Sequence, residues 1–343
     1  MKRVLVVGAG PAGMSAAYFL SLHEGYDITV AERLDTSYSR YHSVCGGGIS
    51  KAAFRKLSPM RPEGVLNGFS GTRIVWPDGT EIRMRTPGYI LDRPAFLGSL
   101  KSQCIEKGVR FVNAGVTGVT YDGTYHSVTD SGIIDSDWII GADGACSAVR
   151  RSLFGSSPAR MIPATEYVVD KAPDSDLTIR LLSDGSGTYT WSFPRGNVTG
   201  TGGMKGYEEQ QYLSKGSRFI PVGGIGKISS ERAMLIGDAA AMANPVSFGG
   251  LRAALISGRK ASEAIVKDDS AVLQRWWDSS ILSDRRFMGF NDTLRGWSEE
   301  EMNDAVRPFR HGGIYLPGIW ACIRRPRYVN MYFGCLFAFR YGW

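Results

Sequence analysis

The chain has 343 residues, of which 43% are hydrophobic and 21% charged, and its formal net charge is +7 at pH 7. This composition argues against a disordered chain and favours a fold of two closely packed domains. The moderate positive charge favours anionic lipids, phosphate-bearing substrates or nucleic acid as partners, without choosing among them.

The cysteine pattern argues against two kinds of architecture. The five cysteines are widely spaced, and they form neither a CxxC pair nor a cluster with histidine. We therefore expect no metal site and no disulfide framework, and a reducing cytoplasm as the setting. The sequence also lacks an apolar run of about 18 residues, the length of a spanning helix, so peripheral contact is the membrane option that stays open.

The first fifty residues predict a strand, a helix, a strand and a long loop. The apolar run at residues 4–7 predicts a buried parallel strand, residues 11–22 a helix and residues 28–31 a second strand. Residues 35–50 show little periodicity and include three consecutive glycines. We expect this stretch to be a loop that carries function.

A glycine motif separates the first strand from the helix. Its GxGxxG spacing lets backbone amides approach a pyrophosphate at the N-terminus of the helix. An acidic residue at the end of the second strand is placed to accept hydrogen bonds from an adenosine ribose. We therefore predict a dinucleotide site, with a structural glycine turn as the alternative. The candidate residues are Gly8, Gly10, Ala12, Gly13, Glu32 and Arg33.

The remaining elements alternate between β-rich segments and isolated helices. They are a hairpin around Trp76, a helix over 94–107, short strands between 109 and 140, antiparallel strands over 177–182, 188–193 and 198–204, a strand over 233–236 and a helix over 250–267. The antiparallel strands predict a substrate-side domain.

Two later segments distinguish FAD from a nicotinamide cofactor. Residues 141–144 read Gly-Ala-Asp-Gly, and residues 236–240 read Ile-Gly-Asp-Ala-Ala. The long FAD molecule uses a late carboxylate for its ribityl and pyrophosphate region and a glycine-opened helix beside its ring, whereas a nicotinamide enzyme needs neither. We predict non-covalent FAD. The candidate contacts here are Asp143, Gly237, Asp238, Pro245, Gly249, Gly250 and Leu251.

Two charged residues proposed to contact the cofactor could instead have an ordinary structural role. Asp238 is the expected late carboxylate, and its alternative role is an ordinary helix N-cap. Arg93, within Tyr-Ile-Leu-Asp-Arg-Pro at residues 89–94, is a candidate partner of flavin or pyrophosphate oxygens. Its alternative is a surface salt bridge.

These motifs together resemble a known superfamily. GxGxxG, Glu32, Leu-Asp-Arg93, GADG and GDAA are similar to the FAD-dependent flavoproteins that include aromatic hydroxylases, flavin halogenases and geranylgeranyl reductases. The segment VCGGGIS at residues 44–50 resembles the Cys-Gly segment of archaeal geranylgeranyl reductases, and YTWSFP at residues 189–194 matches their YxWxFP signature. The resemblance covers roughly residues 1–270. The longer PxxYxCG pattern of the family is present only at Cys45 and Gly46.

The resemblance implies a fold, and we divide the chain accordingly. We expect an α/β protein in which a Rossmann-type FAD-binding domain is interwoven with an antiparallel-sheet substrate domain, followed by a C-terminal helical and aromatic segment. The FAD-binding domain comprises residues 1–70, 101–157 and 221–270, the substrate domain an insertion at 71–100 and residues 158–220, and the C-terminal segment residues 271–343.

The resemblance also implies a reaction on an isoprenoid chain. Tyr189, Trp191 and Phe193 alternate along one strand and so form an aromatic wall that suits such a chain, although half of a sheet-to-sheet core is the alternative. Alkene reduction needs hydride from flavin N5 and a proton from a nearby acid, which is Cys45 or an ordered water. The catalytic candidates are Cys45, Gly46, Tyr189 and Trp191, and Cys45 is also expected to approach the flavin. An inert buried thiol is the alternative for Cys45.

The C-terminal segment combines arginines with aromatic residues. Residues 306–343 contain six arginines, ten aromatic residues and no aspartate or glutamate. This mixture is typical of a membrane interface or a lipid head group, and the main alternative is a helical cap on the substrate cavity. Dimerisation and nucleic-acid contact are lesser alternatives, and no nucleic-acid-binding motif supports the latter.

Our leading hypothesis is an FAD-dependent prenyl reductase of lipid biosynthesis, similar to digeranylgeranylglycerophospholipid reductases. It acts in the cytoplasm, peripherally on the membrane, and takes electrons from NADPH or a donor protein such as ferredoxin. The runner-up is an FAD-dependent monooxygenase or halogenase of an apolar or aromatic substrate. A third hypothesis is a non-enzymatic one, in which the protein is a lipid carrier that binds flavin without catalysis.

Overall fold

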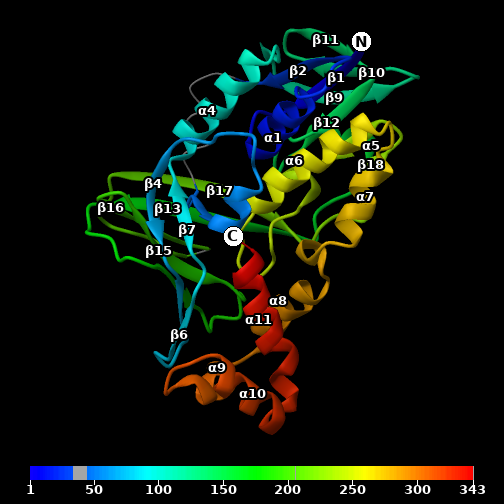
Figure 1. Ribbon diagram of the computed structural model, residues 1–343. Coiled ribbons are helices and arrows are strands. Elements are labelled where there is room, and N and C mark those ends of the chain that lie inside the picture. Colours follow the sequence, from blue (N-terminus) through cyan, green and yellow to red (C-terminus); the bar gives the residue numbers. More distant parts are fainter. Residues whose placement is uncertain (34–44, 205, 343) are drawn as a thin grey trace.

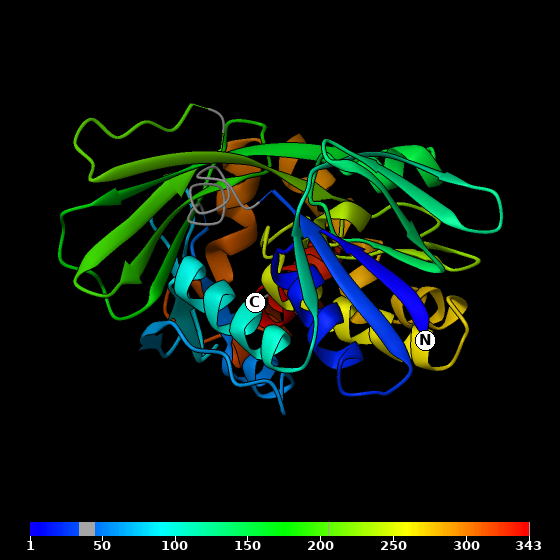
Figure 2. The same ribbon diagram turned by 90° about the horizontal axis from the view of Figure 1, so that it is seen from above.

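The computed structural model describes residues 1–33, 45–204 and 206–342. Two large sheets and a group of C-terminal helices make up the molecule (Figure 1). From above, the antiparallel sheet lies to one side and strands β1 and β2 to the other, with the C-terminus between them (Figure 2). The predicted α/β fold class is confirmed.

The first sheet is parallel except at one edge, where β18 runs antiparallel to β19. Its six strands, in order across the sheet, are β18 (Ser229–Ser230), β19 (Ala233–Leu235), β12 (Trp138–Gly141), β1 (Lys2–Val7), β2 (Tyr26–Glu32) and β8 (Arg110–Asn113). The apolar run that predicted the first strand is buried on both faces, as a covered parallel strand requires. The strands predicted at 4–7, 28–31 and 233–236 are confirmed.

Two helices cover this sheet in close contact with each other. They are α1 (Pro11–Leu20), which begins with proline in its first turn, and α6 (Leu251–Val266). A Cβ at Gly258 of α6 would lie 2.4 Å from the carbonyl oxygen of Ala12 in α1. The Ser15 hydroxyl donates a 2.6 Å hydrogen bond to the Leu255 carbonyl. Glycine therefore lets the two backbones touch.

The second large sheet has seven mostly antiparallel strands. They are, in order, β17 (Ser214–Val222), β13 (Arg160–Val169), β16 (Val198–Gly203), β15 (Tyr189–Arg195), β14 (Leu177–Leu181), β5 (Thr72–Val75) and β6 (Glu81–Met84). The last two form the hairpin predicted around Trp76, and β5 joins β14 in parallel. The antiparallel sheet predicted from its later strands is confirmed.

Two small sheets and three helices complete the first 160 residues. The sheets are β11 (Gly132–Ser136), β10 (Tyr125–Thr129) and β9 (Val116–Tyr121), and β3 (Gly48–Ser50), β7 (Gly88–Leu91) and β4 (Val65–Phe69). The helices are α3 (Lys51–Arg55), α4 (Arg93–Glu106) and α5 (Ala148–Leu153). Of the loop predicted over 35–50, residues 35–44 lie outside the described part of the chain. The prediction is wrong for residues 48–50, because they form strand β3 and pair with β7.

From residue 237 onward, the elements of the chain are helices. Its elements are η1 (Gly237–Ala240), α7 (Ala271–Asp278), η2 (Ile281–Ser283), α8 (Arg286–Gly296), α9 (Glu299–Val306), η3 (Arg307–Phe309), α10 (Tyr315–Arg324), η4 (Pro326–Tyr328) and α11 (Val329–Tyr341). Side chains from α8, α9 and α11 join one buried cluster with the antiparallel sheet, including Phe290, Val306 and Phe339. The C-terminal segment is therefore helical and packs on the antiparallel sheet. Within the described ranges, none of the helices has both the length and the apolar character needed to cross a bilayer.

Candidate functional site

A cavity of about 1010 Å³ is lined by residues of both large sheets. Most of the residues predicted from the sequence line it. They are Gly8, Gly10, Ala12, Glu32, Arg33, Cys45, Gly46, Arg93, Asp143, Tyr189, Trp191, Phe193, Asp238, Gly249, Gly250 and Leu251. Gly13, Gly237 and Pro245 are not among the lining residues.

The glycine turn needs its glycines for two separate reasons. Gly8 has a φ of +104°, which a residue with a side chain rarely adopts, and a Cβ there would lie 2.4 Å from the Ala142 carbonyl oxygen. A Cβ at Gly13 would lie 1.9 Å from the Gly8 carbonyl oxygen. Gly13 therefore brings the first turn of α1 against the strand end without reaching the cavity itself.

Glu32 closes the other side of this turn. Its carboxylate accepts hydrogen bonds from the backbone amides of Ala9, at 3.0 Å, and Arg33, at 2.8 Å. Burial raises the pKa of Glu32, and these two hydrogen bonds oppose the rise. The carboxylate is thus fixed at the strand end where an adenosine ribose is expected.

Asp143 and Arg150 join the two later glycine motifs. The Asp143 carboxylate accepts hydrogen bonds from the Ser147 hydroxyl, at 2.6 Å, and from the backbone amide of Ala148, at 2.6 Å, so it stabilises the start of α5. Arg150 is buried and donates to the carbonyls of Ala145, at 2.6 Å, and Ala239, at 2.7 Å. The GADG and GDAA segments are therefore held side by side.

Asp238 faces the cavity from the 3-10 helix η1. It lies inside η1, whose N-cap is Ile236, so the N-cap alternative is wrong. It pairs instead with Arg218 of β17, at 3.0 Å. This ion pair connects the parallel-sheet side of the cavity to the antiparallel sheet, and Arg218 was not identified from the sequence.

Arg93 is the first residue of α4 and is only 3% exposed. The surface salt bridge that was its alternative is therefore wrong. Its Nε is buried without a hydrogen-bond partner in the described part of the chain, and the residue lines the cavity. A buried guanidinium with a free donor is suited to an anionic ligand.

The Cys45 segment lies against the aromatic strand β15. A Cβ at Gly46 would lie 2.6 Å from the Phe193 ring, and Arg195 donates a 3.4 Å hydrogen bond to the Cys45 carbonyl. The Cys45 side chain is only partly buried and lines the cavity, so a fully buried inert thiol is excluded. These contacts place the thiol loop beside the aromatic residues.

Tyr189, Trp191 and Phe193 share one face of β15 and all line the cavity. Tyr189 is fully enclosed and donates a hydrogen bond to the Ser247 carbonyl. Its ring lies 5.4 Å from that of Phe248 and 6.3 Å from that of Trp191. The aromatic residues therefore belong both to the core and to the cavity wall.

Glu166 is a cavity residue that sequence reasoning missed. It lies on β13, 5% exposed, and burial raises its pKa to about 7. Arg195, whose Nη1 lies 3.9 Å from Glu166 Oε1, and a hydrogen bond from the Cys45 backbone oppose this rise. The available signal was a lone acidic residue within the β-rich segment 160–169.

The loop before α6 is supported by the C-terminal helix. Its Phe248 has a φ of +50°, a conformation that costs free energy and is common at functional sites. A Cβ at Gly249 would lie 2.1 Å from the Gly342 carbonyl oxygen, and Arg252 donates a 3.1 Å hydrogen bond to the Tyr341 carbonyl. The sequence did not predict that α11 reaches this loop.

The cavity suits a long anionic cofactor. The N-caps of α1 and α6, Gly10 and Gly250, make no side-chain capping hydrogen bond, and neither helix has an acidic residue in its first turn. Both positive helix ends therefore remain open where their caps line the cavity. Together with the unpartnered Arg93 donor, they fit the pyrophosphate and the ring of a flavin dinucleotide. No metal-binding group occurs among the described residues.

Comparisons with known proteins agree with this geometry. Residues 6–40 match the NAD(P)-binding Rossmann-like domain. In an alignment 355 positions long, the chain is 24% identical to the digeranylgeranylglycerophospholipid reductase of Methanothrix thermoacetophila. The alignment covers 88% of this chain and 89% of that protein. The chain is 28% identical over 323 residues to digeranylgeranylglycerophospholipid reductase 1 of Methanopyrus kandleri, covering 80% and 84%.

The fold has solved counterparts. The crystal structure of a geranylgeranyl bacteriochlorophyll reductase-like protein from Thermoplasma acidophilum superimposes with a TM-score of 0.78 at 20% identity, covering 96% of this chain and 97% of that one. A flavin-dependent brominase superimposes with a TM-score of 0.61. The resemblance indicated by the motifs is confirmed: the chain is a homologue of the curated digeranylgeranylglycerophospholipid reductases, with the fold of flavin-dependent oxidoreductases.

Proposed function

We propose that the protein is an FAD-dependent reductase that saturates carbon–carbon double bonds in the isoprenoid chain of a lipid. The observation that supports this most directly is the meeting of Cys45, Glu166 and the aromatic face of β15 in one cavity. The curated relatives named as reductases support the same reaction class.

FAD is held without a covalent bond in this proposal. The glycine turn at Gly8 and Gly10 would hold the pyrophosphate, and Glu32 would hold the adenosine ribose. Arg93 and Asp238 would hold the middle of the cofactor, and the N-terminus of α6 would face its ring. When reduced, the bound flavin supplies a hydride to the alkene.

The residues of the chain supply the matching proton. The Cys45 thiol donates a proton to the alkene carbon that does not receive the hydride, so the double bond becomes a single bond and a thiolate remains. Glu166, whose pKa burial raises to about 7, returns a proton toward the thiolate in its protonated form and is reprotonated from solvent. Glu166 acts through Cys45 and is therefore a positioning residue and proton reservoir.

The aromatic residues hold and shield the substrate. Tyr189, Trp191 and Phe193 present apolar ring faces to the cavity and suit an isoprenoid chain better than a polar ligand. Their burial also keeps water away from the reacting carbons.

The free cysteines and the lipid substrate favour a cytoplasmic enzyme that works peripherally at the membrane.

The electron donor is external in this proposal, since FAD occupies the GxGxxG site. NADPH or a reduced ferredoxin-type protein supplies two electrons for each double bond. Mixing either donor with the oxidised flavoprotein under anaerobic conditions and recording the rate of flavin bleaching distinguishes the two.

The reaction itself is tested without a biological donor. The protein is reduced by dithionite, incubated anaerobically with a panel of unsaturated polyprenyl lipids, and the products are analysed by mass spectrometry. A reductase adds two hydrogens per double bond and reoxidises its flavin. A product gaining an oxygen or halogen atom only when oxygen is present, or lipid binding without flavin reoxidation, contradicts the proposal.

A further inference from the structure

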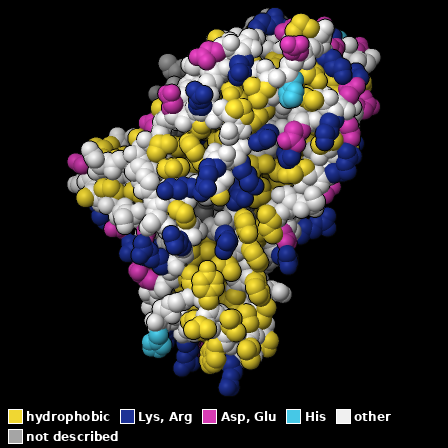
Figure 3. Space-filling model, viewed as in Figure 1, with side chains coloured by type: hydrophobic (Ala, Val, Ile, Leu, Met, Phe, Trp, Pro, Cys, Tyr) yellow, Lys and Arg dark blue, Asp and Glu magenta, His cyan; other side chains and the backbone are white. Residues whose placement is uncertain are grey.

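One helix at the end of the molecule exposes an unusual number of large apolar side chains. On α10 they repeat along one side of the helix and are 51% to 80% exposed: Tyr315, Leu316, Ile319, Trp320 and Ile323. Ala321, on the other side, is fully buried. Figure 3 shows the resulting apolar area at the end of the molecule where Figure 1 places α10 and α11. We call these five side chains the α10 face.

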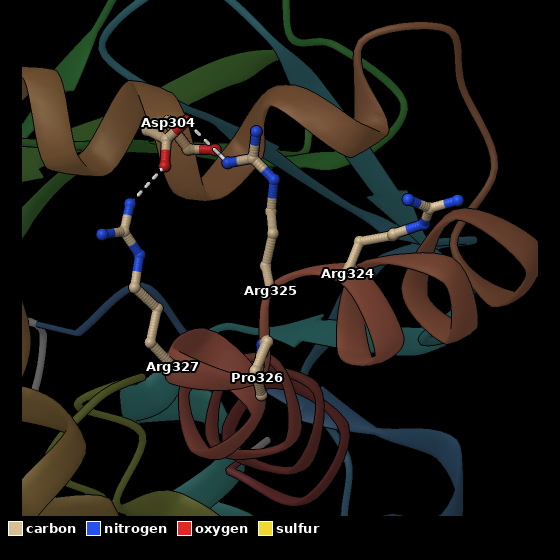
Figure 4. Close-up of a pocket in the computed structure, with 5 residues that line it drawn as sticks. All are labelled: Asp304, Arg324, Arg325, Pro326 and Arg327. Atoms are coloured by element: carbon tan, nitrogen blue, oxygen red, sulfur yellow. Dashed lines mark hydrogen bonds and ion pairs between the residues drawn. The ribbon is translucent and has the colours of Figure 1, made fainter.

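Arginines border the α10 face. A surface hollow of about 410 Å³ is lined by Asp304, Arg324, Arg325, Pro326 and Arg327. Asp304 pairs with Arg325, at 2.6 Å, and with Arg327, at 2.8 Å, whereas Arg324 points away from it (Figure 4). Arg324 makes no ion pair with any described residue, and the hollow carries three positive charges against one negative.

The charge pattern favours an anionic bilayer over a second copy of the chain. A symmetric dimer through the α10 face would bring together two borders that each carry three arginines against one aspartate, so like charges would predominate at the contact. Phosphate groups of lipids instead match guanidinium groups in charge and geometry.

The size of the helix determines the mode of contact. With ten residues, α10 is about 15 Å long, and a bilayer core is about 30 Å thick. It therefore cannot span and is suited to lie in the plane of the interface, with its apolar face among the acyl chains.

We propose that the α10 face is a docking surface for an anionic phospholipid bilayer. Its five apolar side chains enter the interface, and the arginines of the hollow, above all Arg324, contact lipid phosphates. This inference goes beyond the proposed reaction and does not depend on it, because docking needs neither flavin reduction nor turnover.

The test is co-sedimentation of the full flavin-loaded chain with vesicles of phosphatidylglycerol or phosphatidylcholine. The parent is expected to bind phosphatidylglycerol vesicles, and salt should weaken this binding. The double variant Ile319→Ser/Ile323→Ser should bind at least about tenfold more weakly. Arg324→Gln should bind about fivefold more weakly and lose part of its preference for the anionic lipid.

A matched control places the same change elsewhere on the surface. Ile133 and Leu213 are 66% and 63% exposed, outside the C-terminal helices, so Ile133→Ser/Leu213→Ser should bind like the parent. Flavin absorbance and circular dichroism verify that each variant is folded. If the parent binds neither vesicle, or if the control pair weakens binding as much as the α10 pair, the proposal is overturned. A dimer that the α10 variant dissociates, without vesicle binding, would overturn it as well.

Discussion

The replacement Glu166→Gln tests whether the buried carboxyl holds its proton at neutral pH. Burial raises the pKa of Glu166 from 4.5 to about 7. Below pH 4.5, the folded and the unfolded chain both carry this proton. As the pH rises toward 7, the unfolded chain loses the proton while the folded chain keeps it, so the free energy of unfolding falls.

The size of this effect follows from the two pKa values. A rise in pKa from 4.5 to about 7 corresponds to a stability loss of about 3 kcal/mol once both states are ionised. Most of it, about 2 to 3 kcal/mol, falls between pH 5 and pH 8. Glutamine keeps the shape of the side chain and an acceptor for the Cys45 backbone, but it cannot ionise. The variant should therefore lack this part of the pH dependence.

Denaturant unfolding of parent and variant at pH 5 and pH 8 measures the difference. The parent should lose about 2 to 3 kcal/mol more than Glu166→Gln over this interval. Glu81→Gln is the control, because the Glu81 side chain is half exposed, and it should follow the parent. Parallel pH dependence in the parent and Glu166→Gln would show that burial does not hold the proton, and the proton reservoir would be refuted.

Three further predictions concern the cofactor, the thiol and the helix contact. Asp238→Ala should release flavin at least about tenfold more readily in a fluorescence titration, and unchanged affinity would remove Asp238 from the cofactor site. Cys45→Ala should retain flavin yet reduce alkenes about a hundredfold more slowly in single-turnover kinetics; an unchanged rate would exclude the thiol as proton donor. Gly258→Ala should lower the free energy of unfolding by about 1–3 kcal/mol, because its Cβ meets the backbone of α1. Gly289→Ala, with open space around its Cβ, should cause no such loss, and equal effects would contradict the packing argument.

The parts of the fold that follow local rules could be predicted from the sequence. The apolar run of β1, the glycines of the turn and Glu32 lie within one short stretch, so their spacing alone indicates how they meet. The alternation of Tyr189, Trp191 and Phe193 likewise predicts a shared face, because side chains of a strand alternate.

The parts that depend on long-range contacts could not be predicted. Arg218 and Asp238 lie on different layers, and their pairing depends on how the two large sheets pack. Glu166 resembles an ordinary polar residue of a strand until the fold buries it beside the Cys45 segment. The contact of Gly342 with Gly249 depends in the same way on where the C-terminal helix ends.

The close packing of α1 on α6 has a consequence for cofactor placement. Because the backbones touch at Gly258, the packing of α1 on α6 sets the spacing between the two open helix ends. In the proposed complex, the two helix ends would therefore hold two parts of one flavin at the spacing that this packing sets. The placement of the cofactor would then depend on the packing of two helices that have no direct part in the reaction.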